Sequence, residues 1–393
     1  MSQDLKYPQL ILKSGRDRSL RNRHPWVFSG GIKQRPKAGN GEIVAVVDNK
    51  GELLGHGHYA PDASLICRMF HFGNEPLVFD EGFFRAKLAD ALTYRRRILD
   101  LEENTGFRLI HAEGDGLPGV VLDVYGSAAA VQLRTKGALS LMPAIEGFLA
   151  DEMGIEHIFL QTNKRNSEEL AGTWVKGGFE DALIRENGVE FHVDIAGGQK
   201  TGFFLDQRDN RAMLRDQAAG HKVLNAFSYT GGFSLFALKG GAQMVHSVDI
   251  SAAAIDQANR NVHTNFGPDA PHVGIKEDCF KYLKEMDNGA YDLIVLDPPA
   301  FTKHISTVKK ASRGYKEINL RALQKIAKGG LLYTFSCSQH ISKDLFRKIV
   351  FGAAADSRRE VRIVAQLEQA PDHPVSIYHP EGEYLKGLVL HVV

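Results

Sequence analysis

The sequence predicts a multidomain α/β protein with a β-rich N-terminal domain, a small central α+β domain and a C-terminal seven-stranded mixed sheet. The chain has 393 residues, 43% of them hydrophobic, which is enough for two or three domains with their own cores. Short apolar runs between turn residues fill residues 8–72, and from residue 222 onward apolar runs alternate with helical patterns. We therefore expect domains at 1–73, 74–190 and 191–393.

The first domain is expected to be a compact β module of five or six strands. Its apolar runs lie at 10–20, 24–32, 41–48, 52–60 and 64–72. Gly73, Asn74 and Pro76 then break the pattern. A helix is predicted over 80–103, because Leu88, Ala91, Leu92, Arg95 and Leu99 recur at helical spacing.

The central domain combines short strand-like runs with one helix near 138–151. The expected strands lie at 108–113, 119–125, 129–134, 157–162, 181–187 and 189–195. Gly197, Gly198 and Gly202 then loosen the chain before a segment at 202–218 that starts a helix.

The C-terminal domain alternates strands and helices, as a parallel sheet covered on both faces does. The expected strands lie at 222–227, 244–249, 273–278, 292–297, 330–336, 362–367 and 384–392. The last strand follows its predecessor through the loop 371–382 rather than through a helix, so it can run antiparallel. The sequence thus predicts seven strands with one reversed.

The charge balance hides a local asymmetry. Lys and Arg number 48 and Asp and Glu number 47, but residues 1–73 hold 11 basic against 6 acidic residues. Within 6–37 there are nine basic residues and only Asp17 against them, and 303–328 holds eight basic residues against Glu317. Such runs are usually solvated faces, but two basic zones are also what nucleic-acid binding requires.

The three cysteines, Cys67, Cys279 and Cys337, lie far apart without CxxC spacing, so neither a disulfide framework nor a zinc ribbon is expected. No stretch approaches ~18 apolar residues. We expect a soluble, cytoplasmic protein without a metal site and without a membrane partner.

Three successive strand ends carry residues that suit an adenosine-containing cofactor. Gly231 and Gly232 allow a tight turn after the first strand, and Asp249, at the end of the second, can accept hydrogen bonds from ribose hydroxyls. The third strand end carries Glu277 and Asp278, followed by Cys279 and Phe280, which suit the adenine amino group and ring. Because neither a GxGxxG fingerprint nor a Walker lysine is present, a nucleoside without phosphates such as S-adenosylmethionine is favoured. The alternative is a glycine turn and an unrelated surface carboxylate.

The fourth strand ends in Asp297, Pro298 and Pro299, followed by Ala300 and Phe301. Two prolines fix φ and remove two N–H donors, so the loop is rigid and its polar groups can hold the exocyclic amino group of a base. The alternative is a simple strand stop.

The fifth strand ends at Cys337, where a thiol can act as a nucleophile. Cytosine C5 is too weak a nucleophile to take a methyl group from a sulfonium, but addition of a thiolate at C6 makes C5 carbanion-like. The alternative is a small buried side chain that serves packing only.

Taken together and in order, these motifs resemble the bacterial ribosomal RNA large-subunit methyltransferase I family, S-adenosylmethionine-dependent enzymes that form 5-methylcytosine in 23S rRNA. The resemblance spans essentially the whole chain. It rests on RLIHAEGDGLPGVVLDVYG, KTGFFLDQR, NAFSYTGGFS, SVDIS, LDPPAF, RGYKEIN, FSCS and the terminal DHP and PEGEYLKG segments. It implies a PUA-like RNA-binding domain at 1–73 and a Rossmann-like class I methyltransferase domain at 191–393.

The resemblance also implies roles for individual residues. The methionine part of the cofactor would be surrounded by Phe227, Ser228, Tyr229, Thr230 and Gly231. Asp249 would hold the ribose, and Asp278 with Cys279 would contact the adenine. The segment that closes over the pocket would contribute Lys200, Thr201, Phe203 and Asp206, with Gln207 and Arg208 nearby.

Asp297 would orient the cytosine beside the cofactor, and Cys337 would attack C6. RNA contacts are expected at Arg16, Arg18, Arg21, Arg23, Lys303, Lys309, Lys310 and Arg313.

One departure from many RNA 5-methylcytosine enzymes is the lack of a second cysteine after the proline motif, where this chain has Pro299 and Ala300. The group that removes the C5 proton is therefore unassigned, and Asp297, a water or a substrate phosphate remain open. Two rivals are a base N-methyltransferase acting on guanine and an inactive RNA-binding assembly factor. The expected partner is 23S rRNA or a large-subunit assembly intermediate; the sequence gives no oligomeric state, and a homodimer is compatible with it.

Overall fold

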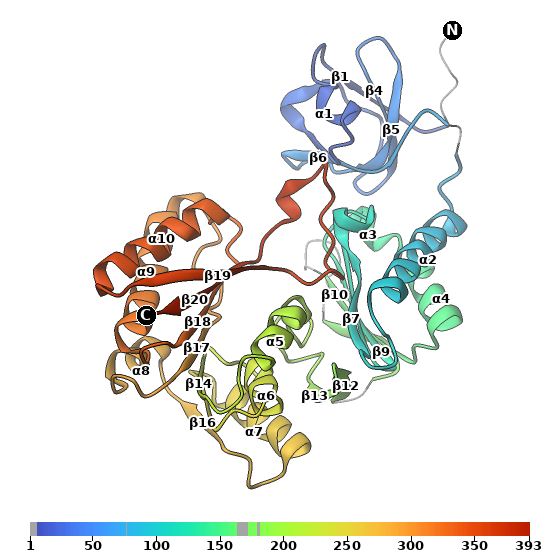
Figure 1. Cartoon of the computed structure of the whole chain (residues 1–393). Coiled ribbons are helices and arrows are strands. Elements are labelled where there is room, and N and C mark those ends of the chain that lie inside the picture. Colours follow the sequence, from blue (N-terminus) through green and yellow to red (C-terminus); the bar gives the residue numbers. More distant parts are fainter. Residues whose placement is uncertain (1–5, 76, 163–171, 179–180) are drawn as a thin grey trace. The chain divides into compact units, whose positions relative to one another are not determined.

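The computed structural model describes residues 6–75, 77–162, 172–178 and 181–393, which form two compact units (Figure 1). The first unit contains the described residues of Met1–Ile184 together with Val193–Phe203 and Pro371–Gly382. The second contains Arg185–His192, Phe204–Ala370 and Glu383–Val393. The expected domain boundaries near 73 and 190 stay predictions.

A six-stranded sheet forms the N-terminal part of the first unit. Its strands are β1 (Gln9–Leu12), β2 (Trp26–Phe28), β3 (Ile32–Gln34), β4 (Ile43–Val47), β5 (Leu53–Tyr59) and β6 (Leu65–Phe72), in the order β2-β6-β5-β4-β1-β3. A core that includes Leu10, Val44, Val46 and Ile66 lies against this sheet. The short helix α1 (Arg18–Arg21) was not predicted; it buries Leu20.

Helix α2 (Glu81–Ile98) follows, and the prediction of a helix to residue 103 was wrong. The Asp80 side chain accepts a hydrogen bond from the Phe83 N–H and starts the helix, as an N-cap does. Leu99 is extended, with φ −130° and ψ 139°, and ends it. The face that carries Leu88, Leu92 and Arg95 is buried.

The central sheet has five strands in the order β11-β10-β9-β8-β7. The strands are β7 (Gly106–His111), β8 (Val120–Tyr125), β9 (Ala128–Leu133), β10 (His157–Thr162) and β11 (Thr173–Lys176), the last not predicted. The single helix expected near 138–151 is two helices, α3 (Lys136–Leu139) and α4 (Met142–Met153). Strands β12 (Ala182–Glu186) and β13 (Val189–Val193) form a separate two-stranded sheet.

The second unit is built on a seven-stranded sheet. Its strands are β14 (Lys222–Ala226), β15 (Met244–Asp249), β16 (His272–Lys276), β17 (Leu293–Leu296), β18 (Leu331–Ser336), β19 (Val361–Glu368) and β20 (Lys386–Val392). The order is β16-β15-β14-β17-β18-β20-β19, and β20 pairs antiparallel with both β18 and β19 while the other pairs are parallel. The predicted seven-stranded sheet with one reversed strand is confirmed.

Helices cover this sheet and connect its parallel strands. They are α5 (Arg208–Arg215), α6 (Gly232–Lys239), α7 (Ala252–Phe266), α8 (Cys279–Glu285), α9 (Val308–Lys325) and α10 (Lys343–Ser357). Short 3₁₀ turns are η1 (Ser29–Gly31) and η2 (Ala112–Asp115) in the first unit, η3 (Leu205–Gln207) and η4 (Ile305–Thr307) in the second, and η5 (Pro380–Gly382) in the first. Across the described ranges, no helix has the length and apolar composition needed to cross a membrane.

Candidate active site

The strand order places the candidate site at a switch point of the sheet. Strand β14 has β15 on one side and β17 on the other, so the chain reverses its direction of winding there. Ligands bind open α/β sheets beyond the carboxyl ends of the strands at such a point. The sequence-predicted groups follow β14, β15, β16, β17 and β18 in turn.

The loop after β14 has a strained backbone. Phe227 and Tyr229 have φ values of 61° and 46°, and Gly231 has 85°. Only glycine adopts positive φ at little cost, so the two larger residues need support from their surroundings. The Ser228 N–H donates to the Val248 carbonyl at 3.0 Å as part of that support.

Asp249 is one of the supports. Its Oδ2 accepts a hydrogen bond from the Tyr229 N–H at 3.0 Å, and its Oδ1 accepts one from the Ser251 N–H at 2.9 Å. The half-buried carboxylate at the end of β15 is therefore held in a fixed orientation.

Cys279 is the second support. Its buried sulfur accepts a hydrogen bond from the Phe227 N–H at 3.2 Å and donates one to the Val248 carbonyl at 3.4 Å. Burial raises the pKa of this thiol to about 12, so it stays neutral. Asp278 next to it is exposed and caps α8 by accepting a hydrogen bond from the Lys281 N–H.

The loop also contains a buried hydroxyl, that of Ser228, which could hydrogen-bond to a bound cofactor. The Ser228 Oγ is buried and has no hydrogen-bond partner among the described residues. Buried polar atoms are normally paired, so this hydroxyl suits a polar ligand that lies on the loop. Together with the Asp249 carboxylate, it fits S-adenosylmethionine.

Asp297 follows β17 in the half-buried proline loop. Its Oδ2 accepts a hydrogen bond from Gln207 Nε2 at 3.0 Å. Further along the loop, the Phe301 ring packs on Tyr315 of α9, with 4.5 Å between ring centroids, and lies 5.9 Å from the Phe280 ring.

Cys337 is half-buried and follows β18. Strands β17 and β18 are parallel neighbours with Leu296 opposite Thr334, so Asp297 and Cys337 follow adjacent strand ends. The next residue, Ser338, is bonded through its hydroxyl to Tyr315 at 2.8 Å and through its carbonyl to Lys386 Nζ at 2.7 Å.

Tyr315 and Lys386 were given no role by the sequence. A lysine inside the apolar run YLKGLVLHV was the signal for Lys386, because a charged side chain on a central strand needs a partner. Burial lowers the pKa of Lys386 to about 8 and raises that of Tyr315 above its usual value.

The predicted closing segment divides between the two units. Thr201 Oγ1 donates to Asp123 Oδ2 at 2.5 Å and is bonded to the Tyr125 hydroxyl at 2.9 Å, all in the first unit. Lys200 is exposed and Phe203 is buried in that unit. Asp206 belongs to the second unit, where its Oδ2 accepts a hydrogen bond from the Tyr384 hydroxyl at 2.6 Å. Their contact with a cofactor stays a prediction.

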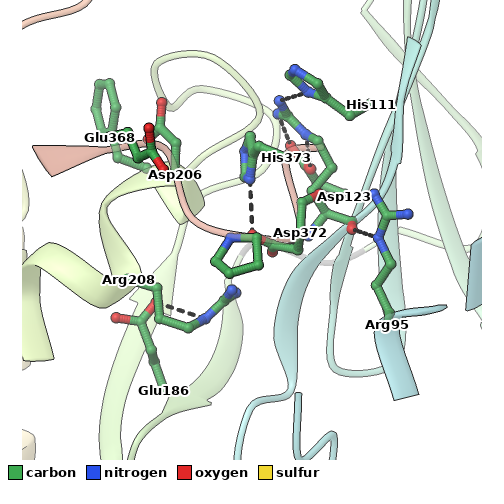
Figure 2. Close-up of polar contacts among 12 residues, drawn as sticks. Arg95, His111, Asp123, Glu186, Asp206, Arg208, Glu368, Asp372 and His373 are labelled. Atoms are coloured by element: carbon green, nitrogen blue, oxygen red, sulfur yellow. Dashed lines mark hydrogen bonds and ion pairs between the residues drawn. The ribbon is translucent and has the colours of Figure 1, made fainter. Parts of the chain in front are cut away.

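Each unit has its own buried ion pairs, and Figure 2 labels some of the residues concerned, among them Arg95, Asp123, Glu186 and Arg208. In the first, Arg95 binds the Asp115 carboxylate and the carbonyl of Asp372, while Asp123 binds Arg108. In the second, Arg211 binds Glu186 through two bonds of 2.7 and 2.6 Å, and Arg208 Nε lies 3.8 Å from Glu186.

The expected RNA-binding arginines of the first unit are not equivalent. Arg16, Arg18 and Arg23 are exposed. Arg21 is exposed too, but its guanidinium forms ion pairs with Asp17, Asp48 and Glu52. It therefore has a structural role that the sequence did not indicate.

In the second unit, the expected RNA-binding residues are all exposed. Lys303 lies on the proline loop, and Lys309, Lys310 and Arg313 lie on α9. Over the described part of the chain, no cluster of three or more His, Cys, Asp and Glu residues is arranged to hold a metal ion.

Comparisons with known proteins agree with this architecture. Residues 131–388 match the family model of S-adenosylmethionine-dependent methyltransferases, and residues 10–72 match the PUA-like domain. The solved structure of SMU.776 complexed with SAH superimposes with a TM-score of 0.84, covering 98% of this chain and 100% of that one, at 22% identity; it is similar in fold.

Curated relatives are similar over nearly the whole length. The ribosomal RNA large subunit methyltransferase I of Alteromonas mediterranea is 41% identical, and the match covers 98% of each protein. The Shewanella denitrificans protein of the same name is 43% identical, covering 98% of this chain and 99% of the relative. The chain thus belongs to the ribosomal RNA large subunit methyltransferase I family of S-adenosylmethionine-dependent methyltransferases.

Proposed function

We propose that this protein methylates C5 of a cytosine in large-subunit (23S) ribosomal RNA through a covalent bond between Cys337 and C6. The observation that carries the proposal is the position of a half-buried Cys337 on the strand end next to Asp297, at the same edge of the sheet as the Asp249 loop. The names of the curated relatives support large-subunit rRNA as the substrate.

Different residues of the chain are proposed to bind the ribose, the methionine part and the adenine of the cofactor. Asp249 holds the ribose hydroxyls, while Ser228 and the Phe227–Gly231 backbone receive the methionine part. Asp278 and Cys279 are assigned to the adenine, and Lys200, Thr201, Phe203 and Asp206 are proposed as further cofactor contacts. When bound, S-adenosylmethionine supplies an electrophilic methyl group on a sulfonium.

The reaction begins when the Cys337 thiolate adds to C6 while Asp297 holds the exocyclic amino group of the cytosine. The S–C6 bond makes C5 nucleophilic, so C5 could accept the methyl group that bound S-adenosylmethionine would supply, with the electrons of the sulfonium–methyl bond staying on the sulfur. A base then removes the C5 proton, and the C6–S bond breaks to return the Cys337 thiolate. The cytosine must leave its stack to reach both groups, which favours an unpaired base in naked rRNA or in an assembly intermediate.

RNA docking is assigned to the domain at 1–73 and to the basic residues of the proline loop and α9. Arg16, Arg18 and Arg23 provide exposed charge in the first, and Lys303, Lys309, Lys310 and Arg313 in the second. The domain at 74–190 connects the docking domain to the methyltransferase domain at 191–393. We also retain cytoplasmic location and a homodimer as parts of the proposal, and light scattering of the purified chain tests the dimer.

A covalent trap tests the mechanism. An rRNA fragment with 5-fluorocytosine at the target position lacks the C5 proton, so the adduct with Cys337 cannot resolve and should appear as a cross-linked band that needs S-adenosylmethionine. The Cys337→Ala variant should give no band and no methylation. Full methylation by this variant would refute the mechanism and favour the N-methyltransferase acting on guanine, whereas absence of S-adenosylmethionine binding by calorimetry would favour an inactive assembly factor.

A further inference from the structure

Lys386 is a buried ammonium group beside the candidate nucleophile. Only 5% of the residue is exposed, and its Nζ donates to the Ser338 carbonyl at 2.7 Å and to the Ile341 carbonyl at 2.6 Å. Both acceptors belong to the turn between β18 and α10 that begins with Cys337. A charge buried on a central strand is costly, so a use for it is expected.

The charge of Lys386 is not neutralised by these contacts. Its two acceptors are carbonyl groups, which carry no net charge. The nearby Glu383 carboxylate forms an ion pair with Lys343. Glu383 raises the pKa of Lys386 and Lys343 lowers it, so their effects oppose each other. Burial is the main influence on the pKa of Lys386 and lowers it, whereas a negative charge at Cys337 would raise it.

We propose that Lys386 is a positioning residue that holds the Cys337 turn and, by its positive charge, favours the thiolate form of Cys337. The inference rests on the proposed role of Cys337 as the nucleophile. A thiolate, not a thiol, adds to C6, and an unperturbed cysteine is only a few per cent ionised at pH 7. Burial lowers the pKa of Lys386 only to about 8, so at pH 7 most of its side chain is still an ammonium, which raises that fraction without taking part in any bond change.

Another group that acts on Cys337, Tyr315, is uncharged. Burial raises the pKa of the Tyr315 hydroxyl on α9, and a negative charge at Cys337 raises it further, so this hydroxyl stays neutral at pH 7. It ties the same turn through its bond to the Ser338 hydroxyl. Tyr315→Phe therefore removes an uncharged tether of the turn and is a matched control for removal of the Lys386 charge.

The test measures the Cys337 thiol itself in the full-length protein. The rate of alkylation by iodoacetamide is followed from pH 6 to 10 by mass spectrometry of the Cys337 peptide. Cys67 and Cys279 are buried with raised thiol pKa values, so they react slowly and do not interfere.

In Lys386→Gln, whose amide can still donate to a carbonyl, the apparent pKa of Cys337 should rise by about one unit, which slows alkylation at pH 7 about tenfold. Lys386→Met should give the same shift and replaces Gln if the latter does not fold. Tyr315→Phe should keep the wild-type pH profile.

A wild-type profile in Lys386→Gln overturns the inference, and so does an equal shift in Tyr315→Phe, since that would indicate general loosening of the turn. The outcomes are separable from those of the proposed function. Methylation by Cys337→Ala would refute the role of Cys337 as the nucleophile while leaving the alkylation measurement valid. A wild-type alkylation profile in Lys386→Gln, together with formation of the 5-fluorocytosine adduct by the wild type, would refute only the role of Lys386.

Discussion

Replacing Asp249 with Asn should weaken S-adenosylmethionine binding strongly while leaving the fold intact. The carboxylate accepts two backbone hydrogen bonds, from Tyr229 at 3.0 Å and from Ser251 at 2.9 Å. Asn retains one acceptor oxygen and places an NH₂ donor against the other N–H. One of the two bonds that fix this side chain to the loop is then broken, and when it is the bond from Tyr229, the positive φ of that residue loses a support.

The size of the effect follows from the energy of such a bond. A hydrogen bond to a charged group contributes about 1.5–3 kcal/mol. Because the loop relaxes when the bond is broken, cofactor binding must restore its shape, and the cost appears in affinity. At 1.4 kcal/mol for each factor of ten, the dissociation constant should rise about 10- to 150-fold, before any loss of the ribose hydrogen bonds is added.

Isothermal titration of S-adenosylmethionine into Asp249→Asn measures this change. Asp256→Asn is the matched control, because it removes the same charge from an exposed position on α7. Binding by the control should equal that of the wild type. An affinity within twofold of the wild type for Asp249→Asn would refute both the ribose role and the loop-support argument.

Two further predictions concern the first unit. His58 is buried beside Phe70 and Phe84, with no hydrogen-bond partner for its ring nitrogens among the described residues, and burial lowers its pKa to about 4. The unfolded chain protonates His58 near pH 6.5 and the folded chain does not, so the free energy of unfolding falls as the pH drops below 6.5, by about 2 kcal/mol at pH 5. In His58→Leu, the free energy of unfolding measured with urea should depend less steeply on pH. An unchanged pH dependence would contradict the assignment. Replacing Arg16, Arg18 and Arg23 with Gln should reduce the slope of log K against log salt concentration for rRNA-fragment binding by about one for each phosphate that the variant no longer neutralises. Arg21→Gln should act mainly on stability. Equal effects of the two changes on this slope would contradict the distinction.

The seven-stranded sheet was predictable because short segments of the sequence mark each of its strands and connections. Each strand of the second unit is an apolar run, and the loop 371–382 in place of a helix indicated the reversal of β20. The misses have local causes too. Helix α1 spans only Arg18–Arg21 in a polar segment, so no periodicity marks it. Helix α2 ends at Ile98 because Leu99 is extended, although the apolar spacing continues through Leu99.

Side-chain contacts between distant segments were not predictable in the same way. Lys386 meets Ser338 across 48 residues, and Thr201 meets Asp123 across 78. Motif spacing indicates which residues follow strand ends, but only the packing of strands and helices determines what each of them contacts. The ion pairs of Arg21 with Asp48 and Glu52 illustrate this, because they join residues 27 and 31 positions apart.

Cys279 and Cys337 both follow a strand in the same sheet, but the sequence analysis assigns them different roles, contact with the adenine for Cys279 and attack on C6 for Cys337. Cys279 is buried, binds two backbone groups of the cofactor loop and has a thiol pKa of about 12, so its sulfur is neutral and used for support. Cys337 is half-buried and lies in the field of an ammonium that has only carbonyls to bind. The neighbours of each sulfur, the Phe227 N–H for one and Lys386 for the other, therefore favour Cys337 as the reactive thiolate.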